Sequence, residues 1–278
     1  IIYTSTDSGE SWKIIMNRLE YSRFDWNIPY MKPRYNGGGN CVHWISDIKL
    51  SPFDSDTALF NTGTGLFMIT GLAIGDVLVK PFCEGIEETV HLNVYTTPHG
   101  RNRIIDIIGD LGGFAFKDYD SECENSFANE KGDRYITCLN ADLTLSDPEY
   151  IVATPRGNWT GKTKGGLILS KDCGSTWERL PMPRGLSEFI DQKLDNIEKP
   201  NVDSGWTAIS ADGKRIMWAV AGGRGFSNKA VCYTDDEGKT WQKSIFTDSS
   251  GNSADEHNVK IFSDYYNSDL FFAIAERE

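Results

Sequence analysis

Apolar and polar residues alternate with a period of two through much of the chain. The alternation occurs in short runs such as TALFNTGTGLFMI (57–69), EETVHLNVYTT (87–97), KRIMWAVAG (214–222) and LFFAIAE (270–276). Turn-forming residues bound most of these runs, which are rich in β-branched and aromatic residues, and this pattern predicts short β-strands. LSEFIDQKLDNIEK (186–199) is the best candidate for a helix, with an amphipathic loop as the alternative. We therefore expect an all-β protein in which helix is a minor component.

A motif of the form Ser/Thr-x-Asp-x-Gly-x-Ser/Thr-Trp occurs three times, at residues 5–12, 170–177 and 234–241. Glycine suits a positive φ in a tight turn, and the aspartate can accept hydrogen bonds from the turn's own amides. The hydroxyl can tie the two arms of the turn together, and the Trp ring is expected to be buried beneath it. We therefore predict three equivalent hairpin turns. A calcium loop with glycine at its sixth position is disfavoured, because the Glu at the twelfth position is missing from all three copies.

The spacing of the three motifs indicates a repeated unit. The Trp residues of the second and third copies, Trp177 and Trp241, are 64 residues apart, and Trp12 precedes Trp177 by 165 residues. Propeller blades typically take about 40–50 residues, so these intervals hold one blade with an insertion and about three blades. The motifs resemble the Asp-box (BNR) repeat of sialidase-like propellers, where they have a structural role at the outer rim.

Composition and charge narrow the choice of partners. The 278 residues include 27 Gly, 8 Trp, 11 Tyr and 14 Phe, a combination typical of short-stranded β-proteins. The net charge of -12 and the absence of a Lys/Arg-rich run argue against nucleic acid. The longest apolar stretch, GLFMITGLAIGDVLV, is too short and too interrupted to span a bilayer, so no membrane partner is expected.

Metal and cofactor sites have no support in the sequence, so we expect neither. The six cysteines allow 15 complete pairings and form no Cys-x-x-Cys or Cys/His pattern, and the four histidines are isolated from one another. Asn158 begins a glycosylation sequon, NWT. The chain starts without Met and within a strand-like run, so we interpret it as a piece of a longer protein whose signal peptide would lie outside it.

Two long segments carry a more specific resemblance. HWISDIKLSPFDSDTALFNTGTGLF (43–67) and CEGIEETVHLNVYTTPHGRNRIIDIIGDLGGFAFKDYD (83–120) resemble the second propeller of glycoside hydrolase family 74, the xyloglucanases and oligoxyloglucan reducing-end cellobiohydrolases. TAISADGKRIMWAV and VCYTDDEGKTWQKS continue the match. Ser51, where the family usually has Asp before Pro, marks a departure that indicates a divergent member.

The resemblance implies a β-propeller of a seven-bladed type. Residues 1–278 would be one propeller domain, an incomplete second propeller of a two-propeller protein whose N-terminal propeller is missing here. Such proteins are secreted hydrolases that cut branched β-1,4-glucans with inversion, in a cleft to which each propeller contributes one carboxylate. A non-catalytic Asp-box propeller that binds a polysaccharide or a protein is the alternative, and sequence beyond residue 1 would separate the two.

Asp47 is the catalytic carboxylate that the resemblance indicates for this chain. Within the strand HWISDIKL its side chain would lie on the same face as those of His43, Ile45 and Lys49, and the side chain of Trp44 would lie on the opposite face. Apolar neighbours are expected to raise its pKa, as a general acid requires. A solvated strand carboxylate is an equally good interpretation of the same residue.

Several other residues are candidates for substrate binding or chemistry. The aromatic, glycine-bearing segment before Asp47 is a plausible glucan platform or an ordinary packed loop. Asp54 and Asp56 are expected to cap a turn, and Glu87 is a further carboxylate in the GIEET sequence. The residues predicted to bind substrate are Trp26, Tyr30, Tyr35, Trp44, Glu88 and Asp110.

Overall fold

The regular structure of the chain consists of β-strands and no α-helix within the residues that the computed structural model describes. The described residues are 1–16, 44–63, 65–86, 89–123, 125–157, 163–183, 205–220, 231–252 and 257–276. The all-β prediction is confirmed, and the helix candidate at 186–199 lies outside these ranges. No helix formed by these ranges has the length and apolar character needed to cross a membrane.

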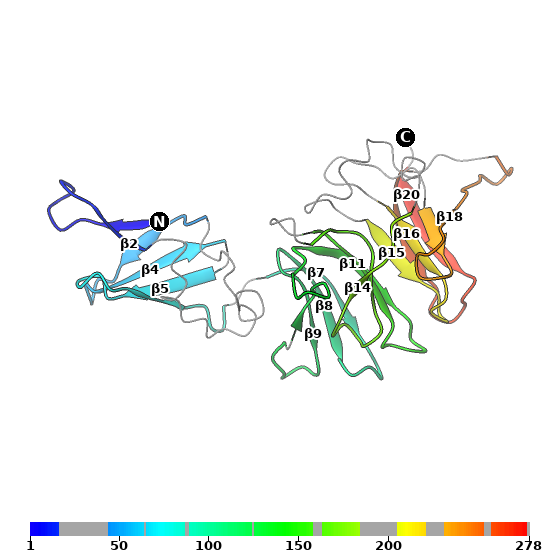
Figure 1. Cartoon of the computed structure of the whole chain (residues 1–278), viewed down its shortest axis with the longest axis horizontal. Coiled ribbons are helices and arrows are strands. Elements are labelled where there is room, and N and C mark those ends of the chain that lie inside the picture. The colour runs from blue at the N-terminus through cyan, green and yellow to red at the C-terminus, as the bar shows by residue number, and fades with distance from the viewer. Residues whose placement is uncertain are drawn as a thin grey trace. The chain divides into compact units, whose positions relative to one another are not determined.

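The chain divides into two compact units, Ile1–Thr89 and Val90–Glu278, which are described separately. Unit 1, blue to cyan in Figure 1, contains two antiparallel sheets. One pairs β1 (Ile2–Thr4) with β2 (Lys13–Met16). The other is a four-stranded meander of β3 (Ile48–Leu50), β4 (Thr57–Thr62), β5 (Gly65–Thr70) and β6 (Leu78–Pro81).

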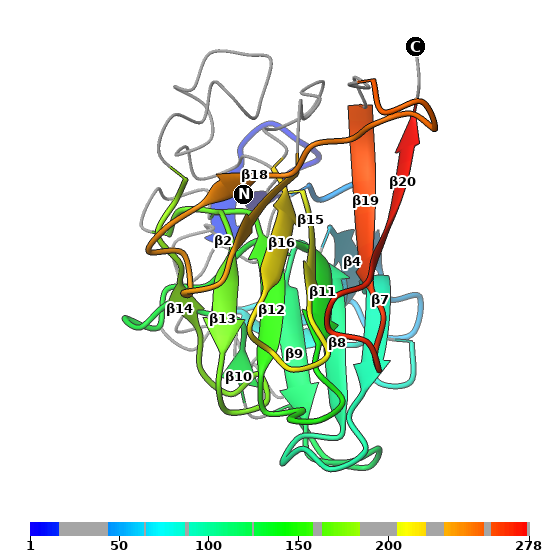
Figure 2. The same ribbon diagram turned by 90° about the vertical axis from the view of Figure 1, so that its right-hand side faces the viewer.

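Unit 2 contains three four-stranded meanders and one strand pair, whose strands run roughly vertically in Figure 2. The first meander consists of β7 (Val90–Thr96), β8 (Ile104–Gly109), β9 (Gly112–Phe116) and β10 (Asn125–Ser126). The second consists of β11 (Cys138–Leu143), β12 (Ile151–Pro155), β13 (Ile168–Ser170) and β14 (Glu178–Arg179). The third consists of β15 (Trp206–Ile209), β16 (Ile216–Ala219), β17 (Val231–Thr234) and β18 (Gln242–Lys243), and β19 (His257–Ser263) pairs with β20 (Phe271–Glu276).

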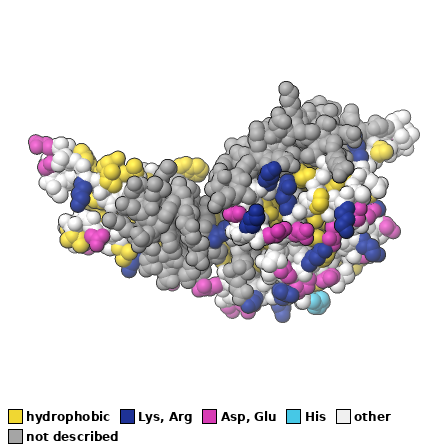
Figure 3. Space-filling view, in the orientation of Figure 1, with side chains coloured by type: hydrophobic (Ala, Val, Ile, Leu, Met, Phe, Trp, Pro, Cys, Tyr) yellow, Lys and Arg dark blue, Asp and Glu magenta, His cyan; other side chains and the backbone are white. Residues whose placement is uncertain are grey.

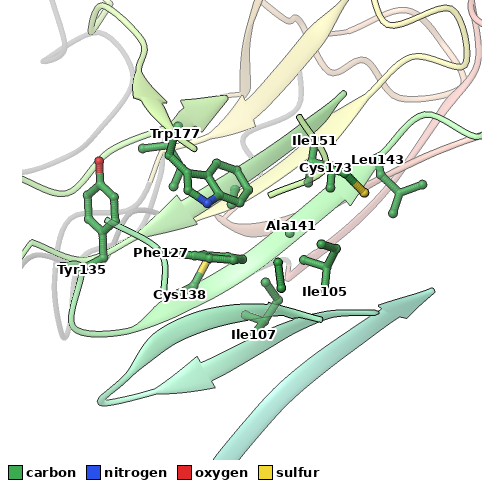
Figure 4. Close-up of a cluster of buried hydrophobic side chains, with 13 residues drawn as sticks. Ile105, Ile107, Phe127, Tyr135, Cys138, Ala141, Leu143, Ile151, Cys173 and Trp177 are labelled. Carbon is green, nitrogen blue, oxygen red and sulfur yellow. The ribbon is translucent and has the colours of Figure 1, made fainter. Parts of the chain in front are cut away.

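Each four-stranded meander has the strand order of a propeller blade. Successive sheets of unit 2 pack face to face, which explains why β12 (IVATP) is buried on both faces and departs from strict alternation. One apolar cluster, shown in Figure 4, lies between the β7–β10 and β11–β14 sheets and includes Ile105, Ile107, Phe127, Ile151 and Trp177. Two further clusters join the later sheets in the same way. We call each four-stranded sheet a blade from here on.

The three repeated motifs form equivalent turns, as predicted. They connect β1 to β2, β13 to β14 and β17 to β18, so each belongs to a different sheet. In the second copy, Asp172 accepts hydrogen bonds from the Thr176 amide at 2.8 Å and the Thr176 hydroxyl at 2.6 Å, and the amide of Gly174 donates to the Ser170 hydroxyl at 2.8 Å. The same bonds recur around Asp7 and Asp236. We call these three segments the repeat turns.

The tryptophans of the repeat turns differ in burial. Trp177 is 4% exposed and contacts Phe127, with ring centroids 4.4 Å apart. Trp241 is partly buried and packs against the cluster that contains Trp218. Trp12, by contrast, is 64% exposed, so the prediction of a buried ring is wrong for the first copy. The hydrogen bonds of the turn therefore form whether or not an apolar surface covers the ring.

The residue between Asp and Gly in each repeat turn has a positive φ although it is not glycine: 61° at Ser8, 55° at Cys173 and 56° at Glu237. In unit 2 this residue contacts the preceding blade. The Asn102 side chain donates to the Cys173 carbonyl at 2.7 Å, and Tyr150 and Lys171 donate to the Glu237 carboxylate at 2.5 and 2.6 Å. The repeat turns of unit 2 thus also connect adjacent blades.

The five described cysteines, Cys83, Cys123, Cys138, Cys173 and Cys232, are all buried, and Cys41 lies outside the described residues. Cys138, Cys173 and Cys232 are free thiols. Burial raises the pKa of the Cys123 thiol to about 11 and that of Cys138 to about 12. The thiols of Cys123 and Cys138 are therefore protonated near neutral pH and pack as small apolar groups.

Candidate active site

The candidate carboxylates lie at corresponding ends of their blades. A four-stranded meander has one end where its first strand begins and its second strand turns into its third. We call this the leading end. Asp47 lies directly before β3, the first strand of the unit 1 blade, and Asp110 lies in the turn between β8 and β9, the second and third strands of the first unit 2 blade. Two exposed carboxylates, Asp47 and Asp110, therefore lie at leading ends, one in each unit.

Asp47 is an exposed carboxylate paired with a lysine. Its Oδ1 atom lies 3.1 Å from Lys49 Nζ and accepts a hydrogen bond from the Ile48 amide at 2.9 Å, and 59% of its side chain is exposed. The bond from Lys49, with help from the Ile48 amide, holds the pKa of Asp47 below its usual range. The predicted increase in its pKa is therefore wrong for this structure.

The backbone around Asp47 also differs from the expected long strand. β3 begins only at Ile48, because the Asp47 amide donates to the Asn61 side chain at 3.0 Å and Ser46 bonds to the same asparagine. Asn61 lies on β4, just before the turn to β5. The alternation of side chains assumed for residues 43–50 therefore does not apply before residue 48.

Asp54 and Asp56 cap the loop after β3, as expected. Asp54 accepts the Asp56 amide at 2.9 Å and the Thr57 hydroxyl at 2.7 Å. Asp56 in turn accepts the amides of Gly71 at 3.2 Å and Ala73 at 2.6 Å. Their hydrogen-bonding capacity is used within the blade.

Asp110 presents its carboxylate from a strained turn. It has φ of 61°, an uncommon conformation for any residue other than glycine, and its amide donates to the Thr137 hydroxyl at 3.0 Å. The next blade thus holds the turn in place, because Thr137 lies directly before β11. The Asp110 side chain is exposed, and no donor among the described residues bonds to its carboxylate. Backbone strain at an exposed carboxylate is typical of functional positions.

Trp44 is the other strained residue among the site predictions. It has φ of 56° and is 80% exposed. Trp44 and Asp110 are the two residues other than glycine that have a positive φ outside the repeat turns, within the described part of the chain. A bulky side chain rarely adopts this conformation. The other residues predicted to bind substrate, Trp26, Tyr30, Tyr35 and Glu88, lie outside the described residues, as do Glu87 and Asn158.

Two buried carboxylates in unit 2 were not singled out from the sequence. Asp106 on β8 lies 2.9 Å from the His91 ring, and Asp142 on β11 accepts hydrogen bonds from the Ile209 amide at 2.9 Å and the Ser263 hydroxyl at 2.7 Å. Burial raises the pKa of Asp142 to about 6. A polar residue inside an apolar strand, as in IIDII and LNADL, is the signal that could have identified both.

The arrangement of charge is compatible with a neutral ligand. Acidic and basic side chains are intermixed on the face of unit 2 in Figure 3. No group of three or more His, Cys, Asp or Glu side chains in the described residues is suited to hold a metal ion. The described site residues carry carboxylate, indole and imidazole groups. The carboxylates and the imidazole can exchange protons, and all three groups can form hydrogen bonds with sugar hydroxyls.

Comparison with known proteins supports the resemblance inferred from the motifs. The chain is 24% identical to a xyloglucanase of Paenibacillus sp. over 99% of its own length and 25% of the relative. It is 25% identical to a xyloglucanase of Acetivibrio thermocellus over 87% of its length and 27% of the relative. It is 27% identical to an oligoxyloglucan-reducing end-specific xyloglucanase of Emericella nidulans over 79% of its length and 30% of the relative. No protein-family model matches the sequence.

Solved structures establish the fold. The family 74 xyloglucanase of Xanthomonas campestris superimposes with a TM-score of 0.69 and 21% identity, covering 98% of this chain and 33% of that one. A family 74 enzyme of Niastella koreensis gives a TM-score of 0.68 and 18% identity, covering 97% of this chain and 32% of that one. These proteins have the propeller fold, so the predicted fold is confirmed, while the number of blades stays a prediction.

The chain spans about a quarter to a third of the length of the relatives and structures that it matches. Its motifs, its sequence similarity along nearly its whole length and its blades agree with one another. The chain is thus homologous to a C-terminal portion of the glycoside hydrolase family 74 xyloglucanases, as its sequence indicates.

Proposed function

We propose that this chain is part of an enzyme that hydrolyses the β-1,4-glucan backbone of a branched polysaccharide of the xyloglucan type. The observation that carries the proposal is the similarity to xyloglucanases along nearly the whole chain. The exposed carboxylates at the leading ends of two blades support it, because glycoside hydrolysis requires carboxyl groups that substrate can reach.

The proposed mechanism is inversion by two carboxyl groups, of which this chain supplies one. A general acid protonates the leaving oxygen while a general base, about 6.5–9.5 Å from it, activates water. The second carboxyl group would come from the part of the protein that this chain does not span, in a cleft between two propellers. The aromatic residues Trp26, Tyr30, Tyr35 and Trp44, with Glu88, would bind the glucan.

Asp110 is a better candidate for the acid than Asp47. A general acid must carry its proton at the working pH, and the ion pair with Lys49 stabilises the charged form of Asp47. Asp110 has no such partner among the described residues, and its turn is held by a hydrogen bond from its own amide to the Thr137 hydroxyl of the next blade. We therefore propose Asp110 as the proton donor and retain Asp47, the residue indicated by the sequence motifs, as the alternative.

Substitution of each aspartate in the full-length protein tests the proposal. We expect Asp110→Asn to lower kcat on xyloglucan by about 10²–10⁴-fold with little change in binding, because the amide keeps the shape but supplies no proton. Asp47→Asn should stay within about tenfold of the wild type, about 1.4 kcal/mol in the activation barrier. Residues 1–278 alone should show no turnover, since one carboxylate cannot serve both roles.

The opposite result would restore Asp47 as the acid: loss of turnover in Asp47→Asn and near-normal turnover in Asp110→Asn. A full-length wild type that binds xyloglucan without cutting it would favour the alternative function, a non-catalytic propeller that binds polysaccharide.

We further propose that the protein acts outside the cell, because a polysaccharide of this size does not cross membranes.

A further inference from the structure

His91 and Asp106 form a hydrogen-bonded pair that the proposed mechanism does not use. The His91 Nδ1 atom lies 2.9 Å from Asp106 Oδ1. The two side chains differ sharply in exposure, at 53% for His91 and 8% for Asp106. A buried carboxylate therefore holds one nitrogen of a ring that is half exposed at the surface.

A β-bulge brings the two side chains to the same face of the sheet. Val94 of β7 pairs with Asp106 of β8, and with regular pairing Leu92 would lie opposite Ile108. The register shifts between His91 and Asn93, so His91 lies opposite Ile108 instead. Residues opposite one another share a face, as do residues two apart on one strand. Without the bulge, His91 would point away from Asp106, which indicates that the bulge serves to orient the ring.

The pair lies at the leading end of the blade that carries Asp110. Asp110 follows Ile108, the partner of His91, by two residues. With about 3.3 Å per residue along a strand and about 5 Å across it, the Cα atoms of His91 and Asp110 are on the order of 8 Å apart. One sugar ring spans a comparable distance, so a glucan whose glycosidic oxygen meets Asp110 would extend past the imidazole.

The hydrogen bond to Asp106 defines what the ring can offer a ligand. A carboxylate accepts only, so the Nδ1 atom donates and, in the neutral ring, Nε2 has the lone pair. Burial raises the pKa of Asp106, whereas the hydrogen bond from His91 acts in the opposite direction. The ring therefore has a fixed orientation, as in the pairs in which a carboxylate orients a functional histidine.

We infer that His91 binds a hydroxyl group of the glucan next to the bond that Asp110 protonates, and that Asp106 is a positioning residue that orients the His91 ring. This inference rests on the proposed function and adds a specific contact to the same site. Asp106 is removed from the substrate by its burial and acts through the imidazole.

Four variants of the full-length enzyme, assayed on xyloglucan, test the inference. His91→Asn keeps an amide that can donate to Asp106 but removes the outer half of the ring. We expect its KM to rise about fivefold with kcat within twofold, the effect of losing one hydrogen bond. His91→Ala should raise KM at least as much and lower the melting temperature, because it leaves a buried carboxylate unpaired. Asp106→Asn should raise KM about threefold, as the ring remains but is poorly oriented.

His99→Asn is the matched control, an exposed histidine in the loop at the other end of β7, and its KM should equal that of the wild type. A folded His91→Asn enzyme with unchanged KM would overturn the inference while leaving the proposed function intact, as would a loss confined to kcat. A wild-type enzyme that neither cuts nor binds xyloglucan would instead overturn the proposed function, and this inference with it.

Discussion

Asp142 shows how a single buried carboxylate can connect successive blades. It lies on β11, and its Oδ2 atom accepts hydrogen bonds from β15, through the Ile209 amide, and from β19, through the Ser263 hydroxyl. The Leu143 amide donates to the other oxygen at 3.0 Å. All three partners donate, which suits an ionised carboxylate, while burial favours the protonated form and raises the pKa to about 6.

The raised pKa of Asp142 predicts a specific dependence of stability on pH. Between the ordinary value of 3.8 and about 6, the native state binds more protons than the unfolded state, so the contribution of Asp142 to stability is lost as pH rises through this window. The difference is on the order of 3 kcal/mol. Asp142→Asn removes the titration, so denaturation at pH 4 and pH 7 should show less loss of stability with rising pH in the variant.

An exposed aspartate provides the control for that measurement. Asp120→Asn, in a loop of the same unit, should keep the pH dependence of the wild type. If Asp142→Asn shows the same difference between pH 4 and pH 7 as the wild type, the carboxylate titrates normally and its burial has been misjudged.

At the scale of single elements, the repeat turns show that the hydrogen bonds of the turn do not depend on burial of its tryptophan. The hydrogen bonds of the three turns are alike, yet only the second copy has a fully covered tryptophan. The structure therefore predicts that the same substitution has different effects in different copies.

Asp172→Ala should lower the free energy of unfolding by about 1–2 kcal/mol, because it leaves the amide and hydroxyl of Thr176 without their acceptor above a packed ring. Asp7→Ala should have a smaller effect, since the first turn is exposed and water can replace the carboxylate. Urea denaturation of the two variants would compare them, with Asp172→Asn as the milder change. Equal losses in both copies would show that burial beneath the turn does not matter.

The elements also show what sequence can and cannot predict here. The repeat turns were predictable because Asp, Gly and a hydroxyl interact within eight residues. The strand predicted over residues 43–50, which includes Asp47, is too long, because the backbone before Ile48 depends on Asn61 of another strand. The pair of His91 and Asp106 depends on a register shift that no local pattern in VHLNV reveals. Interactions that span two strands or two blades are thus the ones that escaped prediction.

At the scale of the whole molecule, the fold could be predicted from the sequence more completely than the site. The blades and the family resemblance follow from periodicity and motifs along the entire sequence. The catalytic assignment depends instead on the surroundings of individual carboxylates, such as Lys49 beside Asp47. Family motifs located both candidate aspartates, but only the structure distinguishes their environments.

Three cysteines of unit 2, Cys138, Cys173 and Cys232, are free and buried, so we predict that they contribute to stability as thiols. In a variant whose Cys41, Cys83 and Cys123 are replaced by alanine, a reducing agent should leave the melting temperature unchanged. A thiol reagent should react slowly with this variant in its native state and rapidly with three thiols after denaturation. A melting temperature that falls by several degrees on reduction would show that these thiols are bridged.

The residue between Asp and Gly in the repeat turns has an implication for how such proteins diversify. The hydrogen bonds that stabilise the hairpin all form within the motif, so a duplicated blade would keep them. The intervening position also reaches the neighbouring blade, through the buried thiol of Cys173, which donates to the Asn102 carbonyl, and through the carboxylate of Glu237, which pairs with Lys171. After a duplication, a change at this one position could give a blade a new preferred neighbour without disturbing its hairpin. In an array of near-identical repeats, the residue at this position in each blade could thus determine which blade packs beside it.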